Sequence, residues 1–193
     1  MKLAISLPNI ITSFRILLIP VLVISFYLLP LESRYLASAA VFTLASLTDW
    51  LDGYLARSMG QMTAFGAFLD PVADKLIVAV ALVLLVEVHA SAILAIPALV
   101  IVCREIVVSA LREWMARYSE KRGVAVSFLG KIKTVFQMIA IIVLLASGPD
   151  RHALTVILGY ILLYAAAGLT LLSMYQYLRL AWPDLYSGMK NRD

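Results

Sequence analysis

The chain has 193 residues and a net charge of +4, and its composition is strongly apolar. Hydrophobic residues make up 63% of it and charged residues 15%, whereas soluble globular domains are typically about 45–50% apolar and about 25% charged. This balance excludes a soluble enzyme, a disordered protein and a disulfide-stapled secreted module, and the single cysteine, Cys103, allows no disulfide within the chain. The composition therefore predicts a polytopic membrane protein.

Six apolar stretches are each long enough to cross a bilayer as a helix, which takes about 20 residues. In chain order they run through residues 8–29, 35–55, 68–88, 92–115, 126–146 and 153–178. Short segments rich in Pro, Gly, Ser and charged residues separate most of them. Because backbone in lipid must satisfy its own hydrogen bonds, the expected fold is all-α. We expect one integral-membrane domain over residues 1–193 with six transmembrane helices.

Lysine and arginine predict which side of the membrane is cytoplasmic. With six spans, Arg34 and Arg151 fall on one side and Arg104 lies near mid-span, whereas the other Lys and Arg residues gather toward the opposite side. Cytoplasmic loops of membrane proteins carry an excess of Lys and Arg. Both termini are therefore expected to be cytoplasmic, and in so apolar a chain the basic excess indicates membrane orientation rather than nucleic-acid binding.

Four aspartates lie where the second and third stretches approach the predicted cytoplasmic side. Asp49 and Asp52 are three residues apart and Asp70 and Asp74 four apart, so each pair shares one face of its helix. The connection between the two helices is short, which makes them antiparallel neighbours and puts both pairs at one depth. A carboxylate at the bilayer centre costs about 2.5–3.5 kcal/mol on insertion scales, so we expect the four to face a shared polar cavity.

Converging carboxylates repel one another unless they are protonated or bridged by cations. Ligand sets made only of oxygen suit Mg²⁺ or Mn²⁺ better than zinc, and metal pairs about 3.5–4 Å apart recur in phosphoryl transfer. A lone intramembrane aspartate could equally be an ion-pair partner or part of a proton relay. Four at this spacing predict a catalytic or binding site.

Small and basic residues flank these acids. Gly53 directly follows Asp52, and Gly66 precedes Asp70 by one helical turn. At such positions a small residue either admits a ligand or packs helices closely. Arg57 lies at the end of the second helix, one turn beyond Gly53, where a guanidinium suits a phosphate but also fits an ordinary cytoplasmic flank.

The spacing of these residues resembles the signature of the CDP-alcohol phosphotransferases. The fixed positions are all filled, in the order Asp49-x-x-Asp52-Gly53-x-x-Ala56-Arg57, then eight residues, then Gly66-x-x-x-Asp70-x-x-x-Asp74. The resemblance implies cleavage of a CDP-alcohol, transfer of its phosphoalcohol to an acceptor hydroxyl and release of CMP. It implies two divalent cations (Mg²⁺ or Mn²⁺) held by Asp49, Asp52, Asp70 and Asp74. It also implies that Asp74 is the general base and that Gly53, Ala56, Arg57 and Gly66 line the CDP site.

The flanking residues are similar to those of bacterial members that use CDP-diacylglycerol and sn-glycerol 3-phosphate. The similar segments are residues 9–15, 48–53, 65–75, 104–113 and 130–134. The resemblance implies these two substrates, a place in the bilayer of the bacterial inner membrane with the active site facing the cytoplasm, and a homodimer.

An acceptor that carries a phosphate dianion needs cations in its pocket. The residues expected to form this acceptor-phosphate site are Arg104, Arg112, Lys131, Lys133, Arg15 and Thr12. For the two lysines, a flank that contacts lipid headgroups is an equal alternative. For Arg104, the alternative is a buried pair with Glu105 or with an acid on another helix.

The carboxylate positions hold no Cys, His or Ser, so direct displacement is expected rather than a covalent intermediate. Within the family, the acceptor could instead be serine, inositol phosphate or phosphatidylglycerol. A more distant alternative is a cation carrier or channel, which favours acids near the bilayer centre and repeat symmetry. Here the acids lie near one interface and no repeat is visible. His89 and His152 fall in turns on the outer side and are expected at the surface.

Overall fold

The computed structural model describes residues 7–59, 64–118, 128–150 and 153–190, and within these ranges it is entirely helical. The helices are α1 (Leu7–Leu28), α2 (Leu31–Met59), α3 (Ala64–His89), α4 (Ala92–Tyr118), α5 (Phe128–Ser147) and α6 (Leu154–Lys190). Each apolar stretch of the sequence coincides with one helix. The main difference from the expected bounds is at α6, which continues well beyond residue 178.

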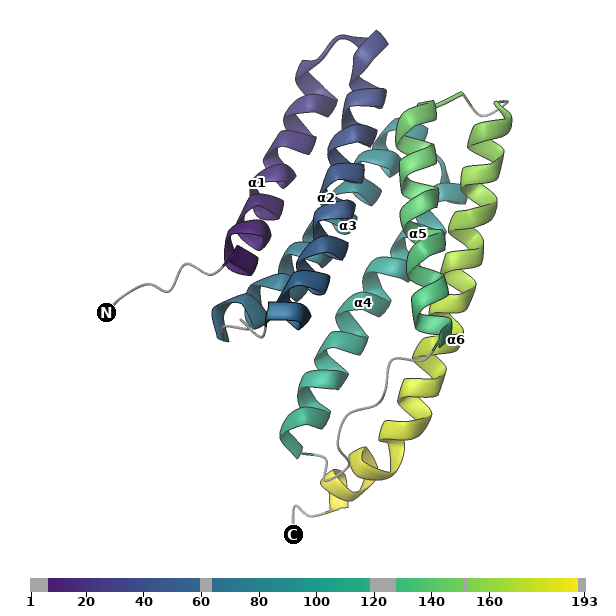
Figure 1. Cartoon of the computed structure of the whole chain (residues 1–193). Coiled ribbons are helices and arrows are strands. Elements are labelled where there is room, and N and C mark those ends of the chain that lie inside the picture. Colours follow the sequence, from purple (N-terminus) through teal and green to yellow (C-terminus); the bar gives the residue numbers. More distant parts are fainter. Residues whose placement is uncertain (1–6, 60–63, 119–127, 151–152, 191–193) are drawn as a thin grey trace.

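The helices run up and down beside one another in a bundle (Figure 1). The turns that join α1 to α2, α3 to α4 and α5 to α6 lie at one end, which we call the upper end. The start of α1 and the ends of α2, α4 and α6 point toward the opposite, lower end. The expected aspartates are therefore carried at the lower end, where α2 finishes and α3 begins.

An apolar core fills the bundle toward its upper end. It is built from buried side chains of all six helices, among them Leu22, Phe42, Leu82, Ile101 and Leu144. Many large apolar side chains also cover the outside of the bundle, including Leu36, Leu99 and Ile161. Helices that are apolar on every side are typical of membrane spans. The fold class of an all-α membrane protein follows from this pattern.

Within the described residues, three helices contain segments that are long and apolar enough to cross a membrane: Ile10–Leu28, Ala92–Met115 and Leu154–Arg179. In α5 the apolar segment Ile132–Ser147 is shorter. In α3 the charged side chains of Asp70, Asp74 and Lys75 interrupt the apolar sequence. Crossing of the bilayer by all six helices, and the direction of that crossing, therefore stay predictions.

Polar contacts tie the helices together at the upper end. The hydroxyl of Tyr27 donates to the carboxylate of Glu87, and that of Tyr164 donates to the carbonyl oxygen of Ile93 at 2.9 Å. The hydroxyl of Tyr160 lies 3.1 Å from Nδ1 of His89. These contacts join α1 to α3 and α6 to both α3 and α4.

The expected surface position of His89 is wrong. Its side chain is only 1% exposed, because Tyr160 of α6 packs edge-to-face against the imidazole as well as contacting Nδ1. Nothing in the local sequence around residue 89 indicates this partner, which comes from a helix far along the chain. His152 lies outside the described residues.

Close packing of α5 against α6 depends on a glycine. A β-carbon at Gly159 would lie 2.6 Å from Cγ of Leu144, which is itself fully buried. At Gly168, on the same helix, a β-carbon would have nothing within 4 Å. An alanine at Gly168 would change only the helix propensity, whereas an alanine at Gly159 would also disturb the packing against Leu144.

We expect Gly159→Ala to destabilise the protein and Gly168→Ala to stabilise it slightly. Overpacking a core costs about 1–3 kcal/mol, whereas replacing a helical glycine by alanine gains about 0.5–1 kcal/mol. Thermal unfolding of both purified variants in the same detergent measures the difference. Equal melting temperatures would contradict the close approach of α5 and α6.

Candidate active site

Two side chains of α1 contact the aspartates of the neighbouring helices. The hydroxyl of Thr12 donates to Oδ1 of Asp70 on α3, and Nη1 of Arg15 lies 2.7 Å from Oδ1 of Asp49 on α2. Thr12 and Arg15 are three residues apart and so share one face of α1. Both are buried, and Arg15 is only 1% exposed. In this way α1 closes one side of the acid cluster.

Asp74 connects the acid cluster to a second group of charged residues. It lies one helical turn beyond Asp70 on α3 and is within electrostatic range of Asp49, Arg15 and Glu105. It also lines a cavity of about 200 Å³ between α3, α4 and α5. The other residues lining this cavity are Lys75, Val78, Arg104, Glu105, Arg112, Lys133, Thr134, Gln137 and Met138.

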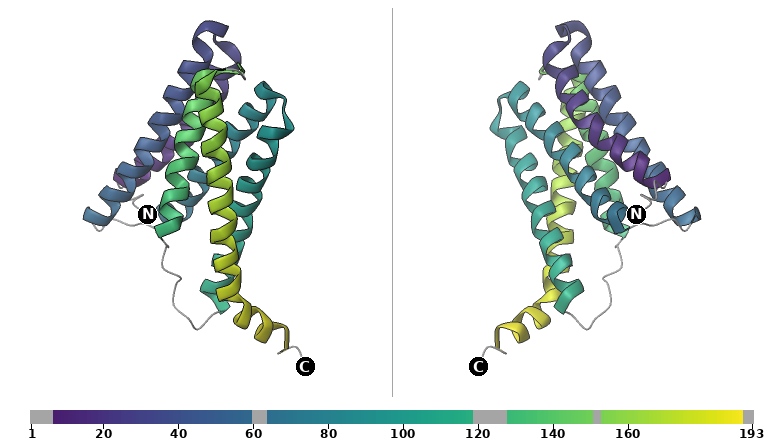
Figure 2. Two further views of the ribbon diagram at one scale, coloured as in Figure 1. Left: turned by 90° about the vertical axis from the view of Figure 1, so that its right-hand side faces the viewer. Right: turned by 90° about the vertical axis from the view of Figure 1, so that its left-hand side faces the viewer.

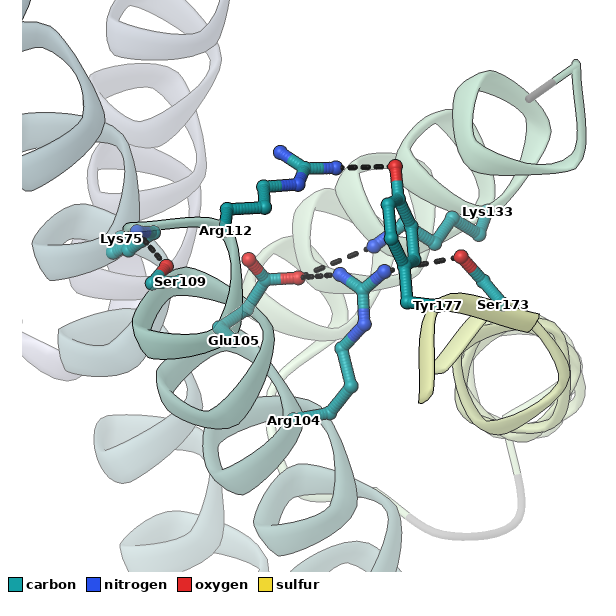
Figure 3. A network of polar contacts seen from close by, with 8 residues as sticks. All are labelled: Lys75, Arg104, Glu105, Ser109, Arg112, Lys133, Ser173 and Tyr177. Atoms are coloured by element: carbon teal, nitrogen blue, oxygen red, sulfur yellow. Dashed lines mark hydrogen bonds and ion pairs between the residues drawn. The ribbon is translucent and has the colours of Figure 1, made fainter. Parts of the chain in front are cut away.

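Glu105 of α4 joins two cations of this cavity, Arg104 and Lys133 (Figure 3). Its Oε1 accepts hydrogen bonds from Nη1 of Arg104 at 2.5 Å and from Nζ of Lys133 at 3.2 Å. Arg104 is buried and extends Nη2 to the Ser173 hydroxyl of α6 at 3.1 Å. One carboxylate thereby joins α4 to α5, while Arg104 joins α4 to α6.

Two further contacts position the remaining cations of the cavity (Figure 3). Nη2 of Arg112 donates to the hydroxyl of Tyr177 at 2.7 Å, and the guanidinium carbon lies 4.9 Å from the centre of that ring. The ammonium of Lys75 on α3 donates to the Ser109 hydroxyl on α4. Each long cationic side chain is thus held by a partner on another helix.

The charges that line the cavity do not cancel. Lys75, Arg104, Arg112 and Lys133 are cations, whereas Asp74 and Glu105 are the only acids among the lining residues that the structure describes. Arg112 donates to the hydroxyl of Tyr177, and this neutral partner does not cancel the charge of the guanidinium. The part of the cavity lined by Arg112 of α4 and Lys133 of α5 is therefore suited to an anion, and guanidinium and ammonium groups are the usual partners of phosphate.

Several predicted site residues lie outside what can be described in atomic detail. Asp52, Gly53, Ala56 and Arg57 lie on α2 and Lys131 on α5, but their side chains are outside the described part of the structure. Gly66 is buried near the start of α3. The structure thus brings three of the four predicted aspartates into one region, and the position of the fourth stays a prediction.

The chemistry of the described donors fits a hard divalent cation. Asp49, Asp70 and Asp74 offer only carboxylate oxygens, the ligands that Mg²⁺ and Mn²⁺ prefer. Within the part of the chain that the structure describes, no three His, Cys, Asp or Glu side chains form a group that could hold a metal ion. The guanidinium of Arg15 pairs with Asp49 and offsets part of the negative charge of the cluster.

Thr12 and Arg15 occupy a different place from the one their predicted role implies. Both contact the carboxylates, and neither lines the cavity that contains Arg104, Arg112 and Lys133. The buried pair of Arg104 with Glu105, which sequence reasoning held as an alternative, is present together with the shared cavity. Arg104 therefore both pairs with Glu105 and lines the cavity that contains Arg112 and Lys133.

Sequence reasoning missed the contributions of Lys75, Ser173 and Tyr177. Lys75 directly follows Asp74, and its position beside a predicted acid was the one signal that could have found it. Ser173 and Tyr177 share one face of α6 and contact Arg104 and Arg112 because α6 packs along α4. No local pattern in α6 indicates that contact.

The sequence pattern of CDP-alcohol phosphatidyltransferases matches residues 5–172 of the chain. The chain belongs to this family. The family predicted from the aspartate spacing is confirmed, and the protein is an enzyme of the CDP-alcohol phosphotransferase class.

Relatives of the enzyme align over almost its whole length. A protein of Pseudomonas fluorescens is 56% identical over 181 residues, which cover 93% of this chain and 92% of the relative. Relatives from Yersinia pestis (strain Pestoides F) and Wigglesworthia glossinidia brevipalpis are 48% and 44% identical and cover 93% and 94% of this chain and 97% of each relative. All three are named CDP-diacylglycerol–glycerol-3-phosphate 3-phosphatidyltransferase.

We expect Glu105→Gln to destabilise the enzyme, because it leaves Arg104 and Lys133 facing each other without a neutralising charge. Removing a charged hydrogen-bond partner in a partly buried site costs about 1–3 kcal/mol. Glu113→Gln, an exposed position on the same helix, serves as the control and should change stability by less. Thermal unfolding in detergent measures both, and equal effects would show that the Glu105 contacts contribute little.

Proposed function

We propose that the enzyme transfers the phosphatidyl group of CDP-diacylglycerol to sn-glycerol 3-phosphate, giving phosphatidylglycerophosphate and CMP. The names and coverage of its relatives support this reaction. The structural observation that carries it is a single cavity lined by Asp74 together with Arg104, Arg112 and Lys133. A base for a hydroxyl and cations for a phosphate are the two things that glycerol 3-phosphate requires.

The acceptor would bind with its phosphate toward Arg112 and Lys133. Arg112 is exposed at the cavity and already oriented by Tyr177, and Lys133 is oriented by Glu105. Arg104 is more deeply buried, so its role would be to hold Glu105 and add positive potential. Lys131 would extend this cationic side from the first turn of α5.

The reaction would proceed by direct displacement. Asp74 would accept the proton of the 1-hydroxyl of glycerol 3-phosphate as that oxygen bonds to the phosphorus next to diacylglycerol. The bond from this phosphorus to the CMP oxygen would break, and the electron pair would leave with CMP. No side chain needs to form a covalent intermediate.

The nucleotide would lie on the side of α2. Gly53, Ala56 and Gly66 would leave room for CDP, and Arg57 would pair with its phosphates. Asp49, Asp52, Asp70 and Asp74 would hold two divalent cations, Mg²⁺ or Mn²⁺. When bound, these cations supply Lewis-acid polarisation of the pyrophosphate and neutralise charge on the leaving group.

Thr12 and Arg15 would act on this side as positioning residues. Arg15 orients Asp49 and Thr12 orients Asp70 through the contacts described above. A buried arginine on α1 also keeps the aspartates from repelling one another before substrate arrives. We place these two residues with the donor half of the site instead of the acceptor half.

The arrangement in the membrane follows from the same proposal. Six spans with both termini in the cytoplasm would put the lower end of the bundle at the cytoplasmic surface of the bacterial inner membrane. Water-soluble glycerol 3-phosphate could then enter from the cytoplasm, and the acyl chains of CDP-diacylglycerol from the bilayer. One domain would span residues 1–193, and the family resemblance supports a homodimer.

The acceptor assay tests the reaction itself. Purified enzyme with CDP-diacylglycerol and Mg²⁺ or Mn²⁺ should release CMP when sn-glycerol 3-phosphate is added and far less with serine, inositol phosphate or phosphatidylglycerol. Chelation of divalent cations should stop the release. Faster release with another acceptor would replace the proposed substrate while leaving the family unchanged.

Asp74→Asn should abolish turnover and leave CDP-diacylglycerol binding largely intact, because the amide cannot accept the proton. General-base catalysis typically contributes about 10²–10⁴-fold to a rate, so we expect at least a hundredfold loss. Asp150→Asn, at an exposed position between α5 and α6, should keep the parent rate. Near-normal turnover by Asp74→Asn would remove this residue from the proton transfer.

A further inference from the structure

The lower end of α6 extends beyond its membrane-spanning segment. Leu154–Arg179 is long and apolar enough to cross a bilayer, and the helix then continues to Lys190. Its last part bends away from the bundle in Figure 2, and Pro183 lies inside this part of the helix. Side chains near residue 179 therefore lie where the hydrocarbon of the membrane gives way to headgroups.

One face of this region carries a stripe of aromatic and cationic side chains. Tyr175, Arg179, Trp182 and Tyr186 are spaced by four, three and four residues, which places them on one side of the helix. All four are exposed, with Tyr175 and Tyr186 at 64% and Trp182 at 61%. Tyr175, Arg179 and Trp182 also line one surface groove together with Leu178 and Pro183.

An apolar groove lies directly above this stripe, between α4 and α6. Leu171 and Met174 of α6 line it from one side, and α4 provides Leu99, Val100, Cys103, Val107 and the stem of Arg104. Met174 is adjacent to Tyr175 in the sequence, so the groove and the stripe follow one another along α6. From Leu171 to Arg179 the distance along the helix is about 12 Å at 1.5 Å per residue.

We propose that this face binds one anionic phospholipid. The phosphate would pair with Arg179 between Tyr175 and Trp182, and an acyl chain would lie in the groove between α4 and α6. Tyrosine and tryptophan favour the headgroup level of membranes, and guanidinium groups bind phosphates through paired hydrogen bonds. Along α6 the apolar groove lies toward the middle of the membrane-spanning segment and Arg179 lies at its end. This order matches the order of acyl chain and headgroup in a phospholipid.

Charge favours a lipid over a second copy of the chain at this place. A symmetric contact through the stripe would bring two Arg179 guanidinium groups toward each other, and the described side chains of the stripe include no acid to separate them. An anionic headgroup instead neutralises the cation. The site is distinct from the cavity at Asp74, and Arg104 is the only described residue that lines both.

Lipid retention by the purified full-length enzyme tests the proposal. The enzyme is equilibrated in detergent with equal amounts of dioleoyl-phosphatidylglycerol and dioleoyl-phosphatidylcholine, and the lipids that remain bound are counted by native mass spectrometry. The parent should retain phosphatidylglycerol preferentially. Arg179→Gln should lower the ratio of bound phosphatidylglycerol to phosphatidylcholine about fivefold, the effect of one basic residue at an anionic membrane surface.

Two variants and one oxidation experiment make the result specific. Arg179→Lys keeps the charge and should keep most of the preference. Lys133→Gln alters a residue of the interior cavity that lines neither the groove nor the stripe, and it should leave the preference unchanged. Loss of the lipid in Lys133→Gln but not in Arg179→Gln would place it in the cavity and overturn the proposal, as would an unchanged ratio in Arg179→Gln. Efficient disulfide crosslinking of two copies through exposed Cys103 would also overturn it, by showing that a second copy covers this face.

Discussion

The lower half of the bundle depends on a carboxylate shared by two cations. Glu105 accepts hydrogen bonds from Arg104 and Lys133, so charged contacts join α4 to α5 in this half. In the upper half, the helices are held together by apolar packing. Without that carboxylate, the two cations would repel each other in a partly buried place. With it, they are held at fixed positions while Arg112 and Lys75 remain beside them. The arrangement stabilises a cavity that stays net positive.

The acid cluster uses the opposite device. There the aspartates are in excess, and Arg15 supplies one buried cation at Asp49 while Thr12 supplies a hydroxyl at Asp70. The acid cluster and the cationic cavity meet at Asp74, which interacts electrostatically with charged residues of both. A substrate that carries phosphates at one end and a reactive hydroxyl at the other matches this division, because the two ends require opposite surroundings.

The sequence predicts the helices well because their signals are local. Apolar stretches of spanning length and their polar interruptions coincide with α1 to α6, and the spacing of Asp70 and Asp74 places them on one face of α3. What the sequence could not show are contacts between distant helices. Thr12 and Arg15 meet acids more than thirty residues away, and Ser173 and Tyr177 meet arginines on α4. The expected surface position of His89 is wrong for the same reason, since the residues near His89 in the chain do not indicate its contact with Tyr160.

The contrast between the two ends of the bundle has a consequence for the cell. Toward the upper end, the interior is closed by fully buried side chains such as Leu22, Phe42 and Leu144, and by the tyrosine contacts to Glu87, His89 and Ile93. In the part of the chain that the structure describes, a layer of fully buried apolar side chains therefore lies between the cavity at the lower end and the polar contacts at the upper end. Such a plug lets a membrane enzyme hold charged reactants within the bilayer without becoming a leak for protons, so that the electrochemical gradient across the membrane is preserved.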